Sequence, residues 1–356
     1  MKLKDSSLLQ IFENLLFPMF PILSIILALI IGAILIFYMK INPLEAYKIL
    51  LKGSLGNIYA LSETIVRTIP ILFTGLGYAI AFNGGLFNVG LEGQFYMGGL
   101  GATLGALFLP SLPSWLHLSI ALLLSFIMGG ALSVIPAFLK AWKGISEIIS
   151  TIMFVYIGMY FVNFMVSGPI RENIYFPQSP PIPTNASLPS IISNTRLTMA
   201  FPLVLIFLFL YYLIFYRNSM GLKIRILGKN PTAAEYIGID RKVMIIVIMF
   251  FSAGLAGLGG ATEVLGVQRR LSEGFSPGYG WDGVTVGLLG QQHPLGMFFA
   301  AFLLGMLRNG GSVMQRQLGV PITIIYVIQA IMLVGVLISS YMNMNKKQKE
   351  SFLKKR

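Results

Sequence analysis

Cysteine is absent from this chain of 356 residues, and His117 and His293 are its only histidines. The first absence excludes disulfides, thiolate metal sites and cysteine nucleophiles, and the second leaves little for a histidine-based metal centre. Charged residues are scarce at 11%, against about 25% in soluble domains, while 56% of residues are hydrophobic and mean hydropathy is +0.78. The composition therefore indicates a protein whose solvent is lipid.

Two further absences narrow the function. No Gly-x-x-x-x-Gly-Lys-Ser/Thr phosphate loop occurs, because the nearest string, Gly228-Lys229-Asn230, lacks the earlier glycine and the hydroxyl that would reach Mg²⁺. No carboxylate pair stands with a histidine at catalytic spacing, so a membrane-embedded enzyme has little support. The net charge of +13 is spread between apolar runs and not gathered in a patch, so we expect no nucleic-acid partner.

Long apolar runs fill most of the sequence, and a run of about 20 apolar residues can cross a bilayer. We therefore expect an all-α membrane protein, one transmembrane domain over 1–356 that forms a polytopic bundle of about ten helices. The eighth and ninth runs are short and interrupted by Gly290 and Pro294, so they could instead be a broken helix pair or a re-entrant segment. The runs lie at about 15–38, 64–82, 86–109, 116–139, 145–166, 200–216, 243–265, 283–293, 295–308 and 321–341.

Lysine and arginine mark the orientation, since short cytoplasmic loops retain positive charge. Most of the 26 basic residues fall on one side if both termini are cytoplasmic, in the plasma membrane. The proline-rich loop 167–199 is then external and irregular. The loop 217–242 is internal and should contain a short helix, with Asn230 as its N-cap, Pro231 in its first position and Gly238 after its end.

Glycines and polar residues gather between the second and third runs, from Asn83 to Gln94. The string VGLEGQ, at 89–94, returns as VGLLGQ at 286–291, after spans expected to run in opposite directions. Inverted repeats with interrupted helices mark the substrate path of many transporters, so we expect repeat-like halves at about 61–166 and 243–341. The alternative for the first string is a cytoplasmic turn with a solvated Glu92.

Other charged and small residues lie inside or beside the runs. Glu63 and Arg67 stand four positions apart in the order that favours a helical ion pair. Glu147 should face water at the inner end of its span, while Glu263 and Asp282 bracket an external break, either for contact with a partner or for structure. Small residues spaced by four are expected to allow close helix packing, and they are Gly101 with Gly105, and Ala253 with Gly257 and Ala261.

Three strings carry a family resemblance: LFNVGLEGQ at 86–94, GKNPTAAEYIGID at 228–240 and SPGYGWDGVTVGLLGQQHPLG at 276–296. In this order, and over nearly the whole chain, they resemble the permeases of ABC importers of the branched-chain amino acid, ribose and nucleoside class. Gln94 and the segment KGSLGN at 52–57 resemble one permease of the two-permease nucleoside and simple-sugar importers. The resemblance implies a helical bundle of the larger, inverted-repeat importer type.

The resemblance also implies partners. A second, homologous permease would share the central path, cytoplasmic ABC ATPases would bind ATP and Mg²⁺, and an extracytoplasmic binding protein or lipoprotein would deliver the substrate. This chain itself would bind no cofactor and no metal, and membrane lipid would surround it.

Two sets of site residues follow from the motifs. Residues of the substrate path or gate are expected to be Phe87, Asn88, Glu92, Gln94, Trp281 and Gln291. Trp281 and Phe87 could stack a nucleobase, or they could be interfacial anchors. Residues of the ATPase-coupling helix, by the family's pattern, are Gly228, Asn230, Pro231, Ala233, Ala234 and Gly238, in which the two alanines would allow a partner surface to approach closely.

The sequence thus predicts a transport subunit and not an enzyme: the permease of an ABC importer for a nucleoside or simple sugar. A branched-chain amino acid permease and an ion-coupled secondary transporter stay open as alternatives, and the latter would place coupling carboxylates near the middle of the membrane.

Overall fold

The computed structural model describes residues 23, 25–108, 113–172, 175–335 and 337–338. Within these ranges the chain is helical, without β-strands, and two isolated β-bridges join loop residues. The described residues form two compact units, Asn57–Met306 and the combination of Met1–Gly56 with Leu307–Arg356. The first part of the fold prediction, an all-α protein, is confirmed.

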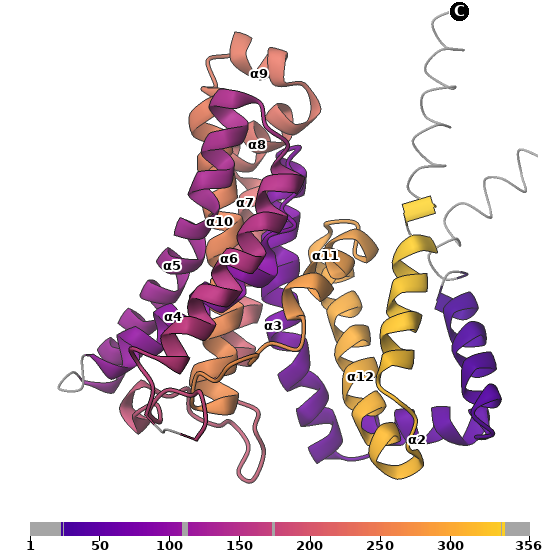
Figure 1. Ribbon diagram of the computed structural model, residues 1–356. Coiled ribbons are helices and arrows are strands. Elements are labelled where there is room, and N and C mark those ends of the chain that lie inside the picture. The colour runs from indigo at the N-terminus through magenta and orange to yellow at the C-terminus, as the bar shows by residue number, and fades with distance from the viewer. Residues whose placement is uncertain (1–22, 24, 109–112, 173–174, 336, 339–356) are drawn as a thin grey trace, which may run out of the picture. The chain divides into compact units, whose positions relative to one another are not determined.

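The unit Asn57–Met306 contains the predicted site residues, and its helices are shown in Figure 1. They are α3 (Ile58–Asn83), α4 (Leu91–Leu107), α5 (Ser114–Lys143), α6 (Glu147–Ser167), the 3₁₀ turn Thr184–Ala186, α7 (Ala200–Arg217), α8 (Ser219–Lys229), α9 (Pro231–Tyr236), α10 (Arg241–Thr262), α11 (Tyr279–Leu289) and the first part of α12 (Pro294–Leu318). A π-helical turn, Glu263–Gln268, continues α10.

Small residues let α4, α5 and α10 approach closely at the centre of this unit. A Cβ added to Gly257 of α10 would lie only 2.5 Å from the carbonyl oxygen of Ser125 in α5. The hydroxyl of Ser125 donates to the carbonyl oxygen of Gly257 at 2.7 Å. A Cβ on Gly101 or on Gly105 of α4 would come within 2.7 Å of the backbone of α5. The predicted close packing through small residues is confirmed, and it permits interhelical contact at backbone distance.

Local sequence explains where several helices begin. Asn57 caps α3 by accepting the N–H of Ala60 at 2.7 Å, and Asp240 caps α10 by accepting the N–H of Lys242 at 2.9 Å. These side chains satisfy donors that the first turn of a helix leaves without partners. The polar residues between apolar runs therefore fix the helix boundaries.

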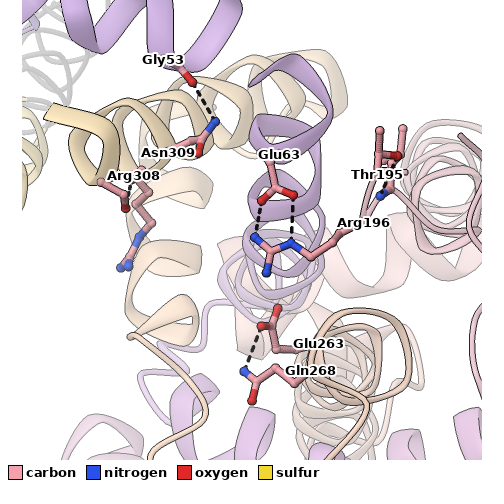
Figure 2. Close-up of polar contacts among 10 residues, drawn as sticks. Gly53, Glu63, Thr195, Arg196, Glu263, Gln268, Arg308 and Asn309 are labelled. Carbon is pink, nitrogen blue, oxygen red and sulfur yellow. Dashed lines mark hydrogen bonds and ion pairs between the residues drawn. The ribbon is translucent and has the colours of Figure 1, made fainter. Parts of the chain in front are cut away.

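The other unit contains the helix Ile25–Tyr38, α2 (Pro43–Leu55), the end of α12 and a helix over Thr323–Gly335. The first two helices meet at a bend of 118°. Asn309 Nδ2 of α12 donates to the carbonyl oxygen of Gly53 in α2 at 3.2 Å (Figure 2). The sequence analysis did not predict α2, because its residues lie between two apolar runs and include Glu45, Lys48 and Lys52.

Six helices are long and apolar enough to cross a membrane, or seven if the bent pair counts as one span. Each predicted run overlaps a helix, although 15–22, 24, 109, 336 and 339–341 lie outside the described residues. The predicted break is present, because α11 ends at Leu289 and α12 begins at Pro294. The ninth run was predicted too short, since α12 has 25 residues. The count of ten spans and the cytoplasmic termini stay predictions.

The predicted irregular loop, 167–199, contains a single 3₁₀ turn among its described residues. Its backbone bonds to the segment that follows α10: Leu188 N–H donates to Leu265 O at 3.0 Å, and Ser179 N–H donates to Leu271 O at 2.8 Å. The loop is therefore fastened to the end of α10. This pairing between distant segments creates the surroundings of the site described below.

The repeated string does not occupy equivalent places in the two halves. Its first copy, Val89 to Gln94, begins α4, whereas the second, Val286 to Gln291, ends α11. In an inverted repeat both copies would hold the same place relative to their helices. The string is therefore no evidence for the repeat, and the boundaries 61–166 and 243–341 stay a prediction.

Candidate functional site

Three of the predicted path residues belong to two buried polar contacts at the start of α4. Asn88 and Gln94 bond to each other twice, since Asn88 Nδ2 donates to Gln94 Oε1 at 2.9 Å and Gln94 Nε2 donates to Asn88 Oδ1 at 3.1 Å. Asn88 Nδ2 also donates to Ser252 Oγ of α10 at 2.9 Å, and its Oδ1 accepts the N–H of Gly90 at 3.0 Å. Both amides are almost fully buried. We call Asn88, Gln94 and Ser252 the amide clamp, which fastens the start of α4 to α10.

Glu92 fastens the same turn to α11. Its Oε2 accepts the backbone N–H of Gly280 at 2.6 Å, and its side chain is buried. A carboxylate in this position satisfies a free donor of the first helical turn and interacts favourably with the helix dipole. The interpretation of Glu92 as a solvated residue of a cytoplasmic turn is therefore wrong.

The remaining path residues are placed differently. Phe87 packs edge-on against Tyr78, with ring centroids 5.4 Å apart. Trp281 is 41% exposed, beside Gly280 at the start of α11. Gln291 is exposed just after the end of that helix, with a positive φ of 51°. Along the axis of α11, Gly280 and Gln291 are about 16 Å apart, so Gln291 does not join the group around Glu92.

Glu147 was expected to face water, and the structure buries it. It is 8% exposed, forms an ion pair with Lys140 at 2.7 Å and accepts the N–H of Phe87 at 3.4 Å. Burial of a carboxylate is unfavourable unless the group is paired and hydrogen-bonded, as Glu147 is. Glu147 therefore connects α5, α6 and the turn before α4.

A second group of polar residues lies near the start of α3. Glu63 was expected to pair with Arg67 on the same helix, but its two carboxylate oxygens instead accept from Nε and Nη2 of Arg196 in the loop before α7, the first at 2.9 Å (Figure 2). The hydrogen bonds that Arg196 donates to Glu63 raise the pKa of its guanidinium. A two-pronged guanidinium–carboxylate pair is more favourable than two point charges, which explains why the distant arginine displaces the near one.

A cavity of about 270 Å³ opens beside this ion pair. Arg67 of α3, Arg196 of the loop, Glu263 and Gln268 of the π-turn, and Phe275 and Tyr279 of the segment leading into α11 line it. Gln268 Nε2 donates to Glu263 Oε1 at 3.0 Å, as Figure 2 shows. Its volume is near the lower end of the roughly 300–1,000 Å³ of small-molecule sites.

The sequence analysis missed most of this cavity. Charges inside or beside the apolar runs were noted at Glu63, Arg67 and Glu263, and a partner contact was one alternative for Glu263, but none of them was given a role in binding cargo. Arg196, Gln268 and Tyr279 stand in polar loops, where their residue types are ordinary. The signal that was available is that all three charges fall on the predicted external side of their spans, since a charge within a span is by default functional.

The short helix predicted in the loop 217–242 is present as α9. Asn230 Oδ1 accepts the N–H of Ala233 at 3.0 Å, Pro231 holds the first position, and Gly238 follows the end with φ of 79°. Gly228 packs where a Cβ would come within 2.7 Å of Gly85 N. The local signals of the sequence are thus confirmed.

The residues that α9 exposes differ from those expected. Ala234 is fully buried and Ala233 half-buried within the chain, so the small size of Ala234 serves packing inside this protein. Tyr236 and Ile237 are instead 88% and 61% exposed. We call these two residues the α9 tip.

The cavity and the α9 tip lie at opposite ends of α3. Glu63, beside the cavity, is near the first residue of α3, while Asn83 ends the helix and donates from Nδ2 to the hydroxyl of Tyr211 at 3.1 Å. Next to Asn83, Gly84 and Gly85 contact Gly228 of α8, which leads into α9 (Figure 1). From Glu63 to Asn83, α3 rises about 30 Å, the thickness of the hydrocarbon core.

Among the described residues, no group of three or more His, Asp and Glu side chains could hold a metal ion.

Comparison with known proteins gives a consistent picture. A family model described as branched-chain amino acid transport system, permease component, matches residues 60–337. The nucleoside ABC transporter permease NupB of Lactococcus lactis is 33% identical over 87% of this chain and 88% of its own length. The guanosine ABC transporter permease NupP of Bacillus subtilis is 34% identical over 90% of this chain and 93% of its own length.

A third relative and one solved structure are more distant. The glucose ABC transporter permease TsgB13 of Haloferax volcanii is 27% identical over 90% of this chain and 87% of its own. The solved structure of PsaBC from Streptococcus pneumoniae in complex with Fab aligns with 82% of this chain and 94% of its own, at 13% identity and a TM-score of 0.41. That structural likeness is too low to compare the two folds.

Proposed function

Since this chain belongs to the family of permease components of branched-chain amino acid transport systems, we propose that it is the permease of an ABC importer that carries a nucleoside or a simple sugar. It is a membrane-embedded transport subunit and not an enzyme. The observation that carries the choice of cargo is the similarity, over about nine-tenths of the chain, to permeases named for a nucleoside, for guanosine and for glucose. Branched-chain amino acids are the alternative cargo, because the family description names them.

The proposal includes the topology. The chain has ten spans and cytoplasmic termini in the plasma membrane, so that the α9 tip is cytoplasmic and the loop 167–199 is external. The separation of the two by the length of α3 supports this.

Because the chain has no cysteine, Tyr236→Cys and Ser190→Cys can be labelled singly in intact cells with a membrane-impermeant thiol reagent. The external Ser190→Cys should react and Tyr236→Cys should react only after permeabilisation; the reverse pattern would refute the orientation.

The partners are a cytoplasmic ABC ATPase, which binds ATP and Mg²⁺, a second permease and an extracytoplasmic binding protein. The exposed α9 tip supports the docking of the ATPase, since an aromatic and a β-branched side chain on a short surface helix offer apolar area to a partner. Gly228, Asn230, Pro231 and Gly238 shape the helix that presents it.

The docking is tested with the double variant Tyr236→Ser and Ile237→Ser. We expect less ATPase to copurify, while the amount of permease in the membrane is unchanged. Ile191→Ser is the matched control, because Ile191 is also exposed, at 44%, and lies in the loop 167–199. Normal ATPase retention by the double variant would refute the assignment. Ala234→Asp tests it less well, because burial of that carboxylate would disturb α9 itself.

The segment from Phe87 to Gln94 contributes to the path or its gate in this proposal. In the described state the amide clamp and Glu92 are buried, so a path along them requires α4 to part from α10 or α11 during transport. Single cysteines at Asn88, Glu92 and Gln94 should then react with thiol reagents faster in one nucleotide state than in another. Labelling that never changes with nucleotide or cargo would leave these residues a static joint.

The energy source distinguishes this function from ion-coupled transport. The full importer should take up radiolabelled guanosine or glucose into vesicles when ATP is supplied to the ATPase, and a protonophore should not abolish uptake. Uptake without ATP that follows an ion gradient would refute an ABC importer, and uptake of leucine alone would favour the alternative cargo.

A further inference from the structure

The cavity beside α3 contains hydrogen-bonding groups that the fold leaves without partners. Nε of Arg67 is buried and has no hydrogen-bond partner, and Arg67 forms no ion pair or hydrogen bond with other described residues. Oε1 of Glu263 accepts from Gln268, whereas the other oxygen of this buried carboxylate accepts no hydrogen bond from the described part of the chain. A buried donor without a partner, such as Nε of Arg67, is rare in folded proteins and calls for an explanation, because it costs stability.

The charges of the cavity sum to about zero. Arg196 is neutralised by Glu63, which leaves one guanidinium, Arg67, and one carboxylate, Glu263. An anionic ligand such as a phosphate would meet the carboxylate, and a cation would meet the guanidinium, so neither has an advantage. An uncharged ligand that can both accept and donate hydrogen bonds matches the two groups together.

Hydroxyl groups have this property, since each can donate to a carboxylate and accept from a guanidinium. The amide nitrogen of Gln268 already donates to Glu263 Oε1 and to the carbonyl oxygen of Phe275, so this residue adds only its amide oxygen, an acceptor, at the same wall. Phe275 and Tyr279 supply an apolar wall that could cover the face of a sugar ring or base. The cavity is lined by three segments that the sequence separates widely, around Arg67, Arg196 and Glu263 to Tyr279. Their convergence depends on the loop pairing that fastens 177–188 to the segment 265–273 at the end of α10.

We propose that this cavity is a cargo site for an uncharged, polyhydroxylated molecule, in which Arg67 donates to the ligand and Glu263 accepts from it. This inference rests on the proposed function, and it specifies which part of a nucleoside or sugar the permease reads: the hydroxyl groups of the sugar ring. Gln268 is a positioning residue, because its hydrogen bond holds the carboxylate of Glu263.

The test uses the full importer in vesicles, with ATP, and guanosine, 2′,3′-dideoxyguanosine, glucose and leucine as cargo. We expect Arg67→Met and Glu263→Gln to raise the concentration for half-maximal uptake of guanosine or glucose about tenfold, the effect of one lost hydrogen bond to a charged group. Uptake of the dideoxy compound, which lacks the 2′ and 3′ hydroxyls, should change little. Arg270→Gln is the matched control, because Arg270 lies at the same end of the unit and pairs with Glu172 outside the cavity lining.

Stability separates a binding role from a structural one. Arg67→Met removes a half-buried guanidinium that has no partner among the described residues. Its thermal midpoint should therefore equal or exceed that of the parent, because binding residues often lower stability for the sake of function. A lowered midpoint together with equal losses for guanosine and its dideoxy analogue would overturn the proposal, because the residue would then be structural.

Thiol protection gives a readout besides transport. Val267 lines the cavity and is half-buried, so Val267→Cys should react with a small thiol reagent, and guanosine or glucose should slow that reaction. Thr184→Cys, which is exposed outside the cavity, should react at the same rate with or without cargo. If the importer takes up guanosine or glucose but neither compound slows the labelling of Val267→Cys, the assignment of the cavity is overturned while the proposed function stands. An importer that takes up leucine and neither hydroxylated cargo would refute the proposed cargo, and this site with it.

Discussion

The amide clamp should hold α4 to α10, and its contribution can be worked out from its four hydrogen bonds. Asn88→Ala removes all four, two with Gln94, one with Ser252 and one with the N–H of Gly90. In helical membrane proteins such polar contacts contribute about 0.6 kcal/mol each on average, and about 1.7 kcal/mol at most. The expected loss in free energy of unfolding is therefore about 2–3 kcal/mol.

Ser252→Ala removes only the contact with Asn88 and should cost about 0.6 kcal/mol. In the Asn88→Ala background the same substitution should cost almost nothing, because the partner is already gone, so the two changes should be non-additive. The assay is reversible unfolding of the purified permease in a detergent titration, followed by tryptophan fluorescence. Ser219→Ala is the control, since Ser219 is exposed and its hydroxyl bonds only to neighbouring Asn218.

Two results would refute this reasoning. The first is an Asn88→Ala variant as stable as the parent, which would mean that water or a rearranged Gln94 replaces the lost bonds without cost. The second is strict additivity of Asn88→Ala and Ser252→Ala, which would mean that the 2.9 Å contact between the two side chains contributes nothing.

Two further predictions concern packing and charge. Gly98→Val should prevent correct folding and Gly98→Ala should be less severe, because any Cβ at this position would overlap the backbone of Gly257, which cannot move without displacing its helix. Size-exclusion chromatography of membrane extracts measures this, and a monodisperse Gly98→Val variant would contradict it. Glu63→Gln should lower the thermal midpoint clearly, and Glu172→Gln should lower it hardly at all. Both variants lose an ion pair with arginine, but the side chain of Glu63 is 8% exposed and that of Glu172 is 39% exposed, and water screens an exposed pair. Equal shifts for the two variants would show that burial does not set the value of these ion pairs.

The sequence by itself determined the class of protein and most of the helices. Apolar runs of span length dictate helices, because lipid offers no hydrogen bonds to the backbone. Every predicted run overlaps a helix in the described part of the chain. Capping residues also act locally, so Asn230, Pro231 and Gly238 were sufficient to place α9. The amphipathic α2 was missed because it lacks a long apolar run.

The candidate site was predictable only in part. The motif at 86–94 pointed to Asn88, Glu92 and Gln94, which do lie among buried polar contacts, yet their partners Ser252 and Gly280 are far along the chain. The repeated string suggested equivalence that the structure does not have, because a string of six residues does not determine whether a helix begins or ends there.

Only the tertiary structure decided how charges pair and where a cavity forms. From the sequence, Arg67 was the natural partner of Glu63, since four positions separate them on one helix. The fold brings Arg196 to the same carboxylate by fastening the loop 167–199 to the end of α10, and the two-pronged bond then leaves Arg67 facing the cavity with Glu263. Helix formation is governed by neighbours in sequence, whereas the choice of an ionic partner depends on distance and geometry in space, which the local pattern does not contain.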